Sequence, residues 1–451
     1  SSYFFQGNLL VKMKRFSDGM LSLRKSLDIR RKIGERKPLI HILLELGRFH
    51  KEQKGYSMAE RYFEEAIEEC NKGKNREEKL SVLKLMGSLF TQQQLFRKAI
   101  DIYCELAIEA DYIIHLDKKF ETLLLAGNKC DFLGNPEFAL EIYIKALISA
   151  YKYGSPGWLS IFLESAGRVY EDIGRYGKSE ASYNFMLKIA QKEMRFEAMV
   201  ESYCYLSHLK FIKGNIKLAE ELIQKSQELS QKTDNKILFW KTLICSGRIK
   251  EEMGKSQESY KNFLDSYKIA TEELTINFME GASNFHLGIS FYLKGNINQS
   301  LFYLREAYRF YKEELNQEKN FLYPRYSAYF YTYRGLTSLM LGHLEEAIEY
   351  TIKALEINTD LGILPGIAGN LSTLGEVYER MGIYEKSEEY FNKALNIYEN
   401  IKDFMGKVRT SGDIGQLYLS CRRYSEAKEL FEMVLSDERV IHLKRIWAIE
   451  M

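Results

Sequence analysis

The sequence predicts an all-α solenoid, a stack of helix-turn-helix units, and three observations support this fold class. A glycine recurs about every 40 residues inside apolar segments, and a small residue follows each of these positions twelve residues later. The 451-residue chain also contains only 5 prolines. Long helices joined by short turns need few prolines, whereas a sheet-rich chain of this length would use more turn residues. A fixed period of this length is the signature of a repeat architecture.

We call the recurring position, which is glycine except at Ser207, the ladder position, and each ladder position marks one repeat unit. The spacing is 40 residues, except for 41 residues before Gly288 and 47 residues before Gly335. Eleven units therefore cover the chain, with ladder positions at Gly7, Gly47, Gly87, Gly127, Gly167, Ser207, Gly247, Gly288, Gly335, Gly375 and Gly415.

Two further positions repeat in step with the first. Twelve residues after it every residue is small, as at Ala59 and Ser387, and sixteen residues after it the residue is usually aromatic, as at Phe391. Small residues let two helices cross closely, and an aromatic ring fills the remaining space. Glycines such as Gly134 and Gly382 fall between these positions, where a helix can end in the left-handed conformation. Each unit is therefore predicted to be helix, tight turn, helix.

These motifs resemble the tetratricopeptide repeat. The segments LGEVY (374–378), GIYEKS (382–387) and YFNKAL (390–395) carry the resemblance, and residues 127–147 and 47–67 match nearly as well. The usual unit of the family has ~34 residues, so the extra residues lengthen the helices. The long unit resembles the repeats of bacterial peptide-sensing regulators, kinesin light chains and Leu-Gly-Asn-type polarity adaptors. HEAT-like arrays lack this ladder, and Sel1-like arrays vary in spacing.

The resemblance implies one right-handed superhelix over residues 1–451, with the first helix of each unit lining a concave groove. Residues 437–451 carry apolar side chains at helical spacing. We expect them to form a C-terminal helix that covers the last unit, or to begin a region that is cut off. Because the chain lacks an initiator Met and its register starts partway into a helix, we expect it to be a fragment.

The groove positions implied by the family change character along the chain. They are polar or basic in the first seven units and apolar in units eight and nine. Basic side chains would bind an acidic peptide by charge-assisted hydrogen bonds, and apolar ones would anchor a side chain. Alternatively, Arg168 and Arg248 pair with glutamates three residues further on. The predicted partner-binding residues are Asn128, Arg168, His208, Arg248, Phe285, Ile289, Tyr292, Tyr329 and Leu336.

The 47-residue step contains the most aromatic segment of the chain. Aromatic clusters are common anchors at protein interfaces, so this segment is a candidate docking surface. The alternative is that longer paired helices bury the rings against each other. The candidate docking residues are Phe321, Tyr323, Tyr326, Phe330 and Tyr331.

Composition and motifs argue against several functions. The net charge of +2 gives no general attraction to nucleic acid or to an anionic membrane, and no apolar run is long enough to span one. The six cysteines are scattered, which favours reduced thiols in the cytoplasm. The Gly-Lys-Ser triplets at 177–179 and 254–256 lack the preceding glycine of a phosphate-binding loop. We expect no metal, no cofactor and no enzymatic activity.

The predicted function is a non-catalytic scaffold or adaptor that binds another protein or a peptide, possibly an acidic one. A second hypothesis is a regulatory arm of a larger signalling or defence enzyme, whose protease, kinase or ATPase domain lies outside this chain. A third is a small-peptide sensor with a DNA-binding head, which would require a helix-turn-helix segment upstream of Ser1.

Overall fold

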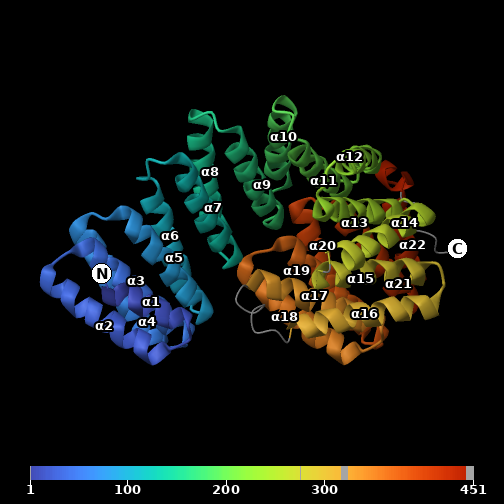
Figure 1. The fold of residues 1–451 in the computed structure, drawn as a ribbon. Coiled ribbons are helices and arrows are strands. Elements are labelled where there is room, and N and C mark those ends of the chain that lie inside the picture. The colour runs from blue at the N-terminus through green and yellow to red at the C-terminus, as the bar shows by residue number, and fades with distance from the viewer. Residues whose placement is uncertain (1, 275, 316–323, 443–451) are drawn as a thin grey trace. The chain divides into compact units, whose positions relative to one another are not determined.

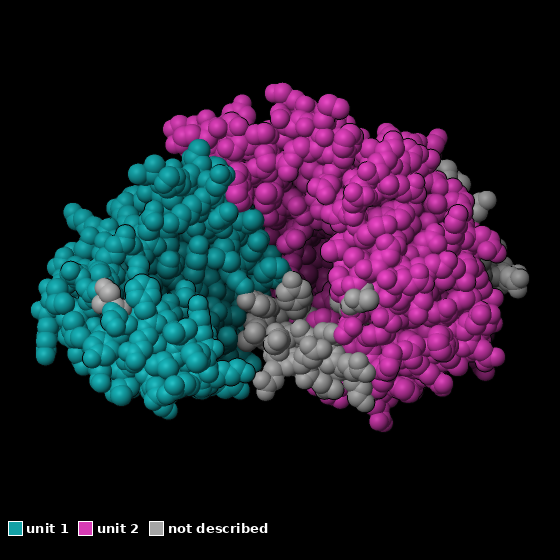
Figure 2. Space-filling view, viewed as in Figure 1, with its two compact units in different colours: residues 1–146 teal, residues 147–451 magenta. Residues whose placement is uncertain are grey.

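The computed structural model describes residues 2–274, 276–315 and 324–442, and in these ranges the chain is all-α, as predicted. It contains 22 α-helices, a π-helical segment at Ile269–Leu274 and a 3-10 turn at Glu438–His442 (Figure 1). The described ranges contain no strand. Two compact units are present, residues 1–146 and residues 147–451, and the boundary lies within α8 (Figure 2).

The helices follow one another as pairs, and each ladder position falls in the first helix of a pair. In the N-terminal part the pairs are α1 (Ser2–Lys12) with α2 (Phe16–Ile33), α3 (Arg36–Glu52) with α4 (Tyr56–Gly73), α5 (Arg76–Gln92) with α6 (Phe96–Ala110), and α7 (Leu116–Phe132) with α8 (Pro136–Lys152).

Unit 2 continues the same arrangement with seven further pairs in its described residues. These are α9 (Pro156–Asp172) with α10 (Tyr176–Lys192), α11 (Phe196–Ile212) with α12 (Ile216–Ser230), α13 (Lys236–Glu252) with α14 (Ser256–Lys268), α15 (Asn277–Leu293) with α16 (Ile297–Leu315), α17 (Pro324–Met340) with α18 (Leu344–Leu361), α19 (Leu364–Arg380) with α20 (Tyr384–Ile401), and α21 (Phe404–Ser420) with α22 (Tyr424–Leu435).

The ladder glycines make room for the aromatic rings of the second helices. A Cβ atom added to Gly375 would lie 2.6 Å from ring carbons of Phe391, and one added to Gly47 would lie 2.3 Å from Phe63. Such distances are shorter than any real Cβ contact, so the paired helices meet too closely for a side chain here. The ring itself is fully buried at Phe391.

In the sixth repeat, formed by α11 and α12, different residues fill the contact between the two helices. Ser207 replaces the glycine, and its hydroxyl donates a 2.7 Å hydrogen bond to the carbonyl of Ala219. The ring position is occupied by the smaller Ile223, which is fully buried. The exception in the ladder therefore comes with a compensating change at the facing position.

The turn inside each pair contains a left-handed residue. At Gly382 φ is +75°, and the next amide, Ile383 N–H, donates to the Tyr378 carbonyl over 2.9 Å. This bond caps a carbonyl that the end of the helix leaves unpaired. The equivalent left-handed positions are Lys14, Lys54, Gln94, Gly134, Gly174, Gly214, Gly254, Gly295, Gly342, Gly382 and Arg422.

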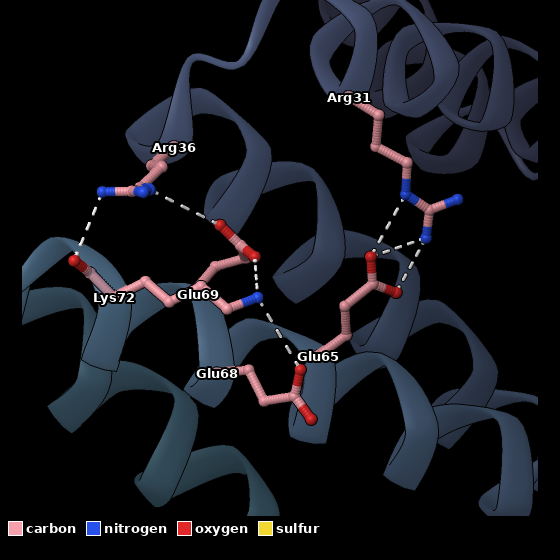
Figure 3. A network of polar contacts seen from close by, with 6 residues as sticks. All are labelled: Arg31, Arg36, Glu65, Glu68, Glu69 and Lys72. Carbon is pink, nitrogen blue, oxygen red and sulfur yellow. Dashed lines mark hydrogen bonds and ion pairs between the residues drawn. The ribbon is translucent and has the colours of Figure 1, made fainter.

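Polar contacts on the surface of unit 1 join α2 to α4 and α3 to α4. Arg31, at the end of α2, donates to both carboxylate oxygens of Glu65 on α4, at 2.6 and 2.8 Å (Figure 3). Lys72 pairs with Glu69 at 2.8 Å, and Arg36 donates to the Lys72 carbonyl (Figure 3). Most of these side chains are exposed, so solvent screens the ion pairs and they contribute little to stability.

In unit 2 the last repeats pack against earlier ones. Helix α9 contacts α19, and α11 contacts α21 (Figure 1). At the turn after α11, a Cβ on Gly214 would lie 2.2 Å from the Phe404 ring, and at the turn after α9 one on Gly174 would meet Ile401 at 2.4 Å. Glycine at these turns thus serves both the left-handed backbone and a contact between repeats about 190 or more residues apart.

The predicted single superhelix over residues 1–451 remains a prediction, because the two units are described separately. The predicted C-terminal helix at 437–451 falls mostly outside the described residues. The described part, Glu438–His442, is a 3-10 turn, and Val440 in it is buried with Phe404 and Val434.

We expect Gly375→Ala to lower the free energy of unfolding by about 1–3 kcal/mol, because the new methyl group would overlap the buried Phe391 ring. Gly369→Ala is a matched control in the same helix, since a Cβ there has only Tyr398 Oη at an ordinary 3.8 Å. The control should be neutral or stabilising by up to about 1 kcal/mol. Urea unfolding followed by circular dichroism measures both, and equal effects of the two variants would contradict the packing explanation.

Candidate functional site

The first helices of unit 2 are joined by polar contacts between successive repeats. The Tyr205 hydroxyl on α11 donates to Glu164 on α9 over 2.8 Å. The same oxygen accepts a 2.8 Å hydrogen bond from Lys241 on α13, whose ammonium lies 4.1 Å from the centre of the tyrosine ring. Three successive first helices are thus connected through one tyrosine.

His208 and Glu171 form a second contact between α9 and α11. The His208 Nδ1 and Glu171 Oε1 atoms are 2.9 Å apart. Burial lowers the pKa of His208, but the Glu171 carboxylate raises it more strongly, so that the net pKa lies above the usual range. The Glu171 carboxylate therefore favours the charged form of the His208 imidazole.

Two ion pairs join distant repeats of unit 2. Arg409 on α21 lies 3.0 Å from Glu252 on α13, and Arg325 on α17 donates to Asp172 at the end of α9. Burial raises the pKa of Asp172, against the attraction of Arg325. Burial lowers the pKa of Arg409, but Glu252, Asp403 and further acidic neighbours together raise it more, so that the net pKa lies above its usual value.

We call these side chains, together with Arg168, Glu201, Arg248 and Asp403, the inner polar cluster. Its members come from first helices α9, α11, α13, α17 and α21 and from the turn before α21, and they influence one another electrostatically. The inner polar cluster comprises Glu164, Arg168, Glu171, Asp172, Glu201, Tyr205, His208, Lys241, Arg248, Glu252, Arg325, Asp403 and Arg409.

The inner polar cluster is accessible to solvent. The side chain of His208 is 35% exposed and that of Arg409 is 42% exposed. Arg248 is exposed and Arg168 is half-buried. Charged groups that are surrounded by protein but still reach water can exchange that water for the polar groups of a ligand.

Carboxyl groups within the inner polar cluster are shifted toward their neutral forms. Burial has the largest effect on the pKa of Glu201. Together with the neighbouring Glu164 carboxylate it raises this pKa to about 7, against the attraction of Lys241. Burial likewise raises the pKa of Asp403. The cluster therefore contains cations at fixed positions and carboxyl groups whose charge depends on their surroundings.

Three of the predicted partner-binding residues, Arg168, His208 and Arg248, belong to the inner polar cluster. Asn128 lies in unit 1, on α7, where its side-chain oxygen accepts a 2.7 Å hydrogen bond from the Tyr143 hydroxyl. Whether any of these residues binds a partner remains a prediction.

The predicted apolar residues gather around one hydrophobic cluster. Phe285 is 5% exposed and packs with Leu304 and Phe330. Ile289, Tyr329 and Leu336 are partly buried against this cluster. Tyr292 is 47% exposed, so among the five predicted apolar residues it presents the most surface.

The candidate docking segment is described only in part. Phe321 and Tyr323 lie outside the described residues, as does the side chain of Tyr326. Phe330 is buried, and Tyr331 is half-buried and stacks on Tyr350 with ring centres 5.9 Å apart. In the described part, Tyr331 packs within its own helix pair and Phe330 packs against the preceding pair, and docking remains a prediction.

Sequence reasoning missed several members of the inner polar cluster. Glu201, Lys241 and Arg409 each lie six residues before a ladder position, which the family frame also points into the groove. Reading that second groove position would have found them. The pairs Asp172–Arg325 and Glu252–Arg409 carry no such signal, because they depend on how the stacked repeats return toward one another.

The described ranges contain neither a metal-binding cluster nor a membrane-spanning helix. No group of three or more His, Cys, Asp or Glu side chains there is arranged to hold a metal ion. Within the same ranges, no helix is both long enough and apolar enough to cross a membrane.

A family match agrees with this geometry over part of the chain. Residues 366–436, which span α19 to α22, match the family described as Tetratricopeptide repeat. The same helix pair with the same close contact recurs along the described residues, which form an all-α solenoid of tetratricopeptide-like repeats. No curated protein matches the sequence.

Three solved structures are similar to this chain, and the first of them shows the same fold class. The Rap protein complexed with Competence and Sporulation Factor is similar at a TM-score of 0.53 and 10% identity, over 79% of this chain and 97% of that one. BtubC (BKLC) from P. vanneervenii matches at a TM-score of 0.33 and 17% identity, over 52% and 92%. Repeats of a putative kinesin light chain from Podospora anserina match at a TM-score of 0.30 and 16% identity, over 43% and 92%.

The raised pKa of Glu201 leads to a pH-dependent prediction. A carboxyl group whose pKa is higher in the folded than in the unfolded chain adds stability at low pH, and this contribution is lost as pH rises through about 7. Glu201→Gln keeps the neutral form at every pH. We expect this variant to raise the apparent Tm by about 2–4 °C at pH 8 and to change it little at pH 5.

Differential scanning fluorimetry at the two pH values makes this measurement. Glu193→Gln, at the exposed end of α10, is the control and should show no such pH-dependent difference. An equal change in Tm for Glu201→Gln at both pH values would contradict the assignment.

Proposed function

We propose that this chain is a non-catalytic scaffold that binds a peptide on the inner polar cluster of unit 2. The observation that carries the proposal is the group of solvent-accessible cations, Arg168, His208 and Arg248, on successive first helices α9, α11 and α13. Evenly spaced cations on one face suit a chain-like ligand with repeated polar groups better than a compact one.

Carboxylates are the ligand groups that these cations would bind best. Glu171 favours the charged form of His208, and the guanidinium of Arg248 is exposed. Each charge-assisted hydrogen bond to a carboxylate contributes about 1.5–3 kcal/mol. The preferred ligand is therefore a peptide with acidic side chains or a free carboxyl terminus.

The inner polar cluster also offers hydrogen-bond partners for a peptide backbone. Lys241 on α13 donates a hydrogen bond to the Tyr205 hydroxyl on α11, and the nearby carboxyl groups are acceptors. The Rap protein, which has the same fold class, is complexed with Competence and Sporulation Factor in its solved structure. This likeness supports a peptide ligand for this chain as well.

We place the protein in a reducing compartment such as the cytoplasm. All six cysteines are free, and Cys70, Cys130 and Cys204 are buried. Buried unpaired thiols are typical of proteins folded under reducing conditions.

The test of this proposal compares two charge reversals of equal size. Peptides from an extract of the native host are captured on the immobilised chain and identified by mass spectrometry, and the affinity of the best one is measured by calorimetry. Arg168→Glu with Arg248→Glu should weaken binding by about 100-fold or more, because two charge-assisted contacts become repulsive.

The control variant combines Lys188→Glu with Lys192→Glu, two exposed positions on the second helix α10. It makes the same change in net charge away from the inner polar cluster and should bind within about twofold of the wild type. Equal loss of affinity in both variants would reduce the effect to net charge. Unchanged affinity in the first variant would move the site elsewhere.

A further inference from the structure

Two cysteines meet beside the inner polar cluster. Cys204 on α11 and Cys245 on α13 have Sγ atoms 3.4 Å apart, and Cys204 donates the hydrogen bond. Cys204 is 2% exposed, whereas Cys245 is only partly buried. The sulfur atoms would have to approach to roughly 2.05 Å to form a disulfide.

The surroundings of Cys245 are cationic. Its hydrogen bond from Cys204 and the charges of His208, Arg248 and Lys241 lower the pKa of the Cys245 thiol, while burial opposes this effect. Cys204 shows the opposite behaviour, because its donated hydrogen bond and its burial raise its pKa. The pair therefore joins one thiol that favours the thiolate with one that remains protonated, the division of roles found in reactive cysteine pairs.

We propose that Cys204 and Cys245 are a peroxide-sensitive pair, in which Cys245 is oxidised first and Cys204 closes a disulfide that links α11 to α13. This inference concerns the thiols themselves and does not depend on the ligand of the proposed function. The oxidant is hydrogen peroxide or a similar hydroperoxide.

The reaction balances in two steps. The Cys245 thiolate attacks one peroxide oxygen, so that an S–O bond forms, the O–O bond breaks and hydroxide leaves and is protonated to water. The Cys204 thiol then attacks the sulfenic acid on Cys245, forming the S–S bond and breaking the S–O bond, and its proton leaves with the hydroxyl group as water. Two thiols lose two electrons in total, and one peroxide is reduced to two water molecules.

The chain contains a comparison pair. Cys104 on α6 and Cys130 on α7 also interact through a thiol hydrogen bond. The charged groups that act on this second pair are the carboxylates of Asp101, Asp131 and Glu141, with no cation among them. The two pairs share the thiol contact and differ in the sign of the neighbouring charge, so the second pair should react more slowly.

The experiment treats the full reduced chain with hydrogen peroxide, blocks the remaining thiols with iodoacetamide, and quantifies disulfide-linked peptides by mass spectrometry without reduction. We expect the Cys204–Cys245 linkage to form at least about tenfold faster than any Cys104–Cys130 linkage. Equal rates, or no Cys204–Cys245 linkage at peroxide levels that oxidise the other cysteines, would overturn the proposal.

Two variants separate the roles of the residues. In Cys204→Ser the Cys245 sulfenic acid has no resolving thiol, so dimedone should label Cys245 more than any other cysteine. In Arg248→Gln, an exposed position, linkage should form several-fold more slowly while the fold is kept. Absence of dimedone labelling on Cys245, or an unchanged rate in Arg248→Gln, would contradict the proposed roles.

Discussion

The close approach of a ladder glycine to a buried ring is the contact on which the structure depends. At Gly47, Gly167 and Gly375 a methyl group would overlap the ring of the paired helix, at 2.3, 2.5 and 2.6 Å. This contact sets the distance between the two helices of a pair. Each pair buries its remaining apolar surface only against its neighbours. The distance within one pair therefore also affects how the next pair packs against it.

The site follows from that repetition. Each first helix in unit 2 is followed about 40 residues later by the next first helix, so side chains at equivalent repeat positions come from successive stacked helices. Later repeats then meet earlier ones, and Arg325 reaches Asp172 while Arg409 reaches Glu252. Charges from distant parts of the sequence become neighbours without leaving the repeat pattern.

The sequence alone predicted the pairs of helices and their turns, because these depend on local spacing and on the repeat period. The inward position of Arg168, His208 and Arg248 stays a prediction. The contact of Phe285 with Phe330 and the ion pairs between distant repeats were not predictable. They depend on small rotations that accumulate from one repeat to the next, and no short sequence motif records that sum. The Cys204–Cys245 contact was missed for the same reason, since their 41-residue separation has meaning only after stacking.

A double-mutant cycle at the glycine–ring contact measures whether the two positions limit each other. Gly375→Ser with Phe391→Ile gives the tenth repeat, formed by α19 and α20, the serine and isoleucine that the sixth repeat carries naturally as Ser207 and Ile223. Urea unfolding of both single variants and the double variant gives the coupling free energy. We expect the free energy of unfolding of the double variant to exceed the value given by adding the two single effects by about 1–2 kcal/mol. Additivity within about 0.5 kcal/mol would contradict it, because the two positions would then not limit each other.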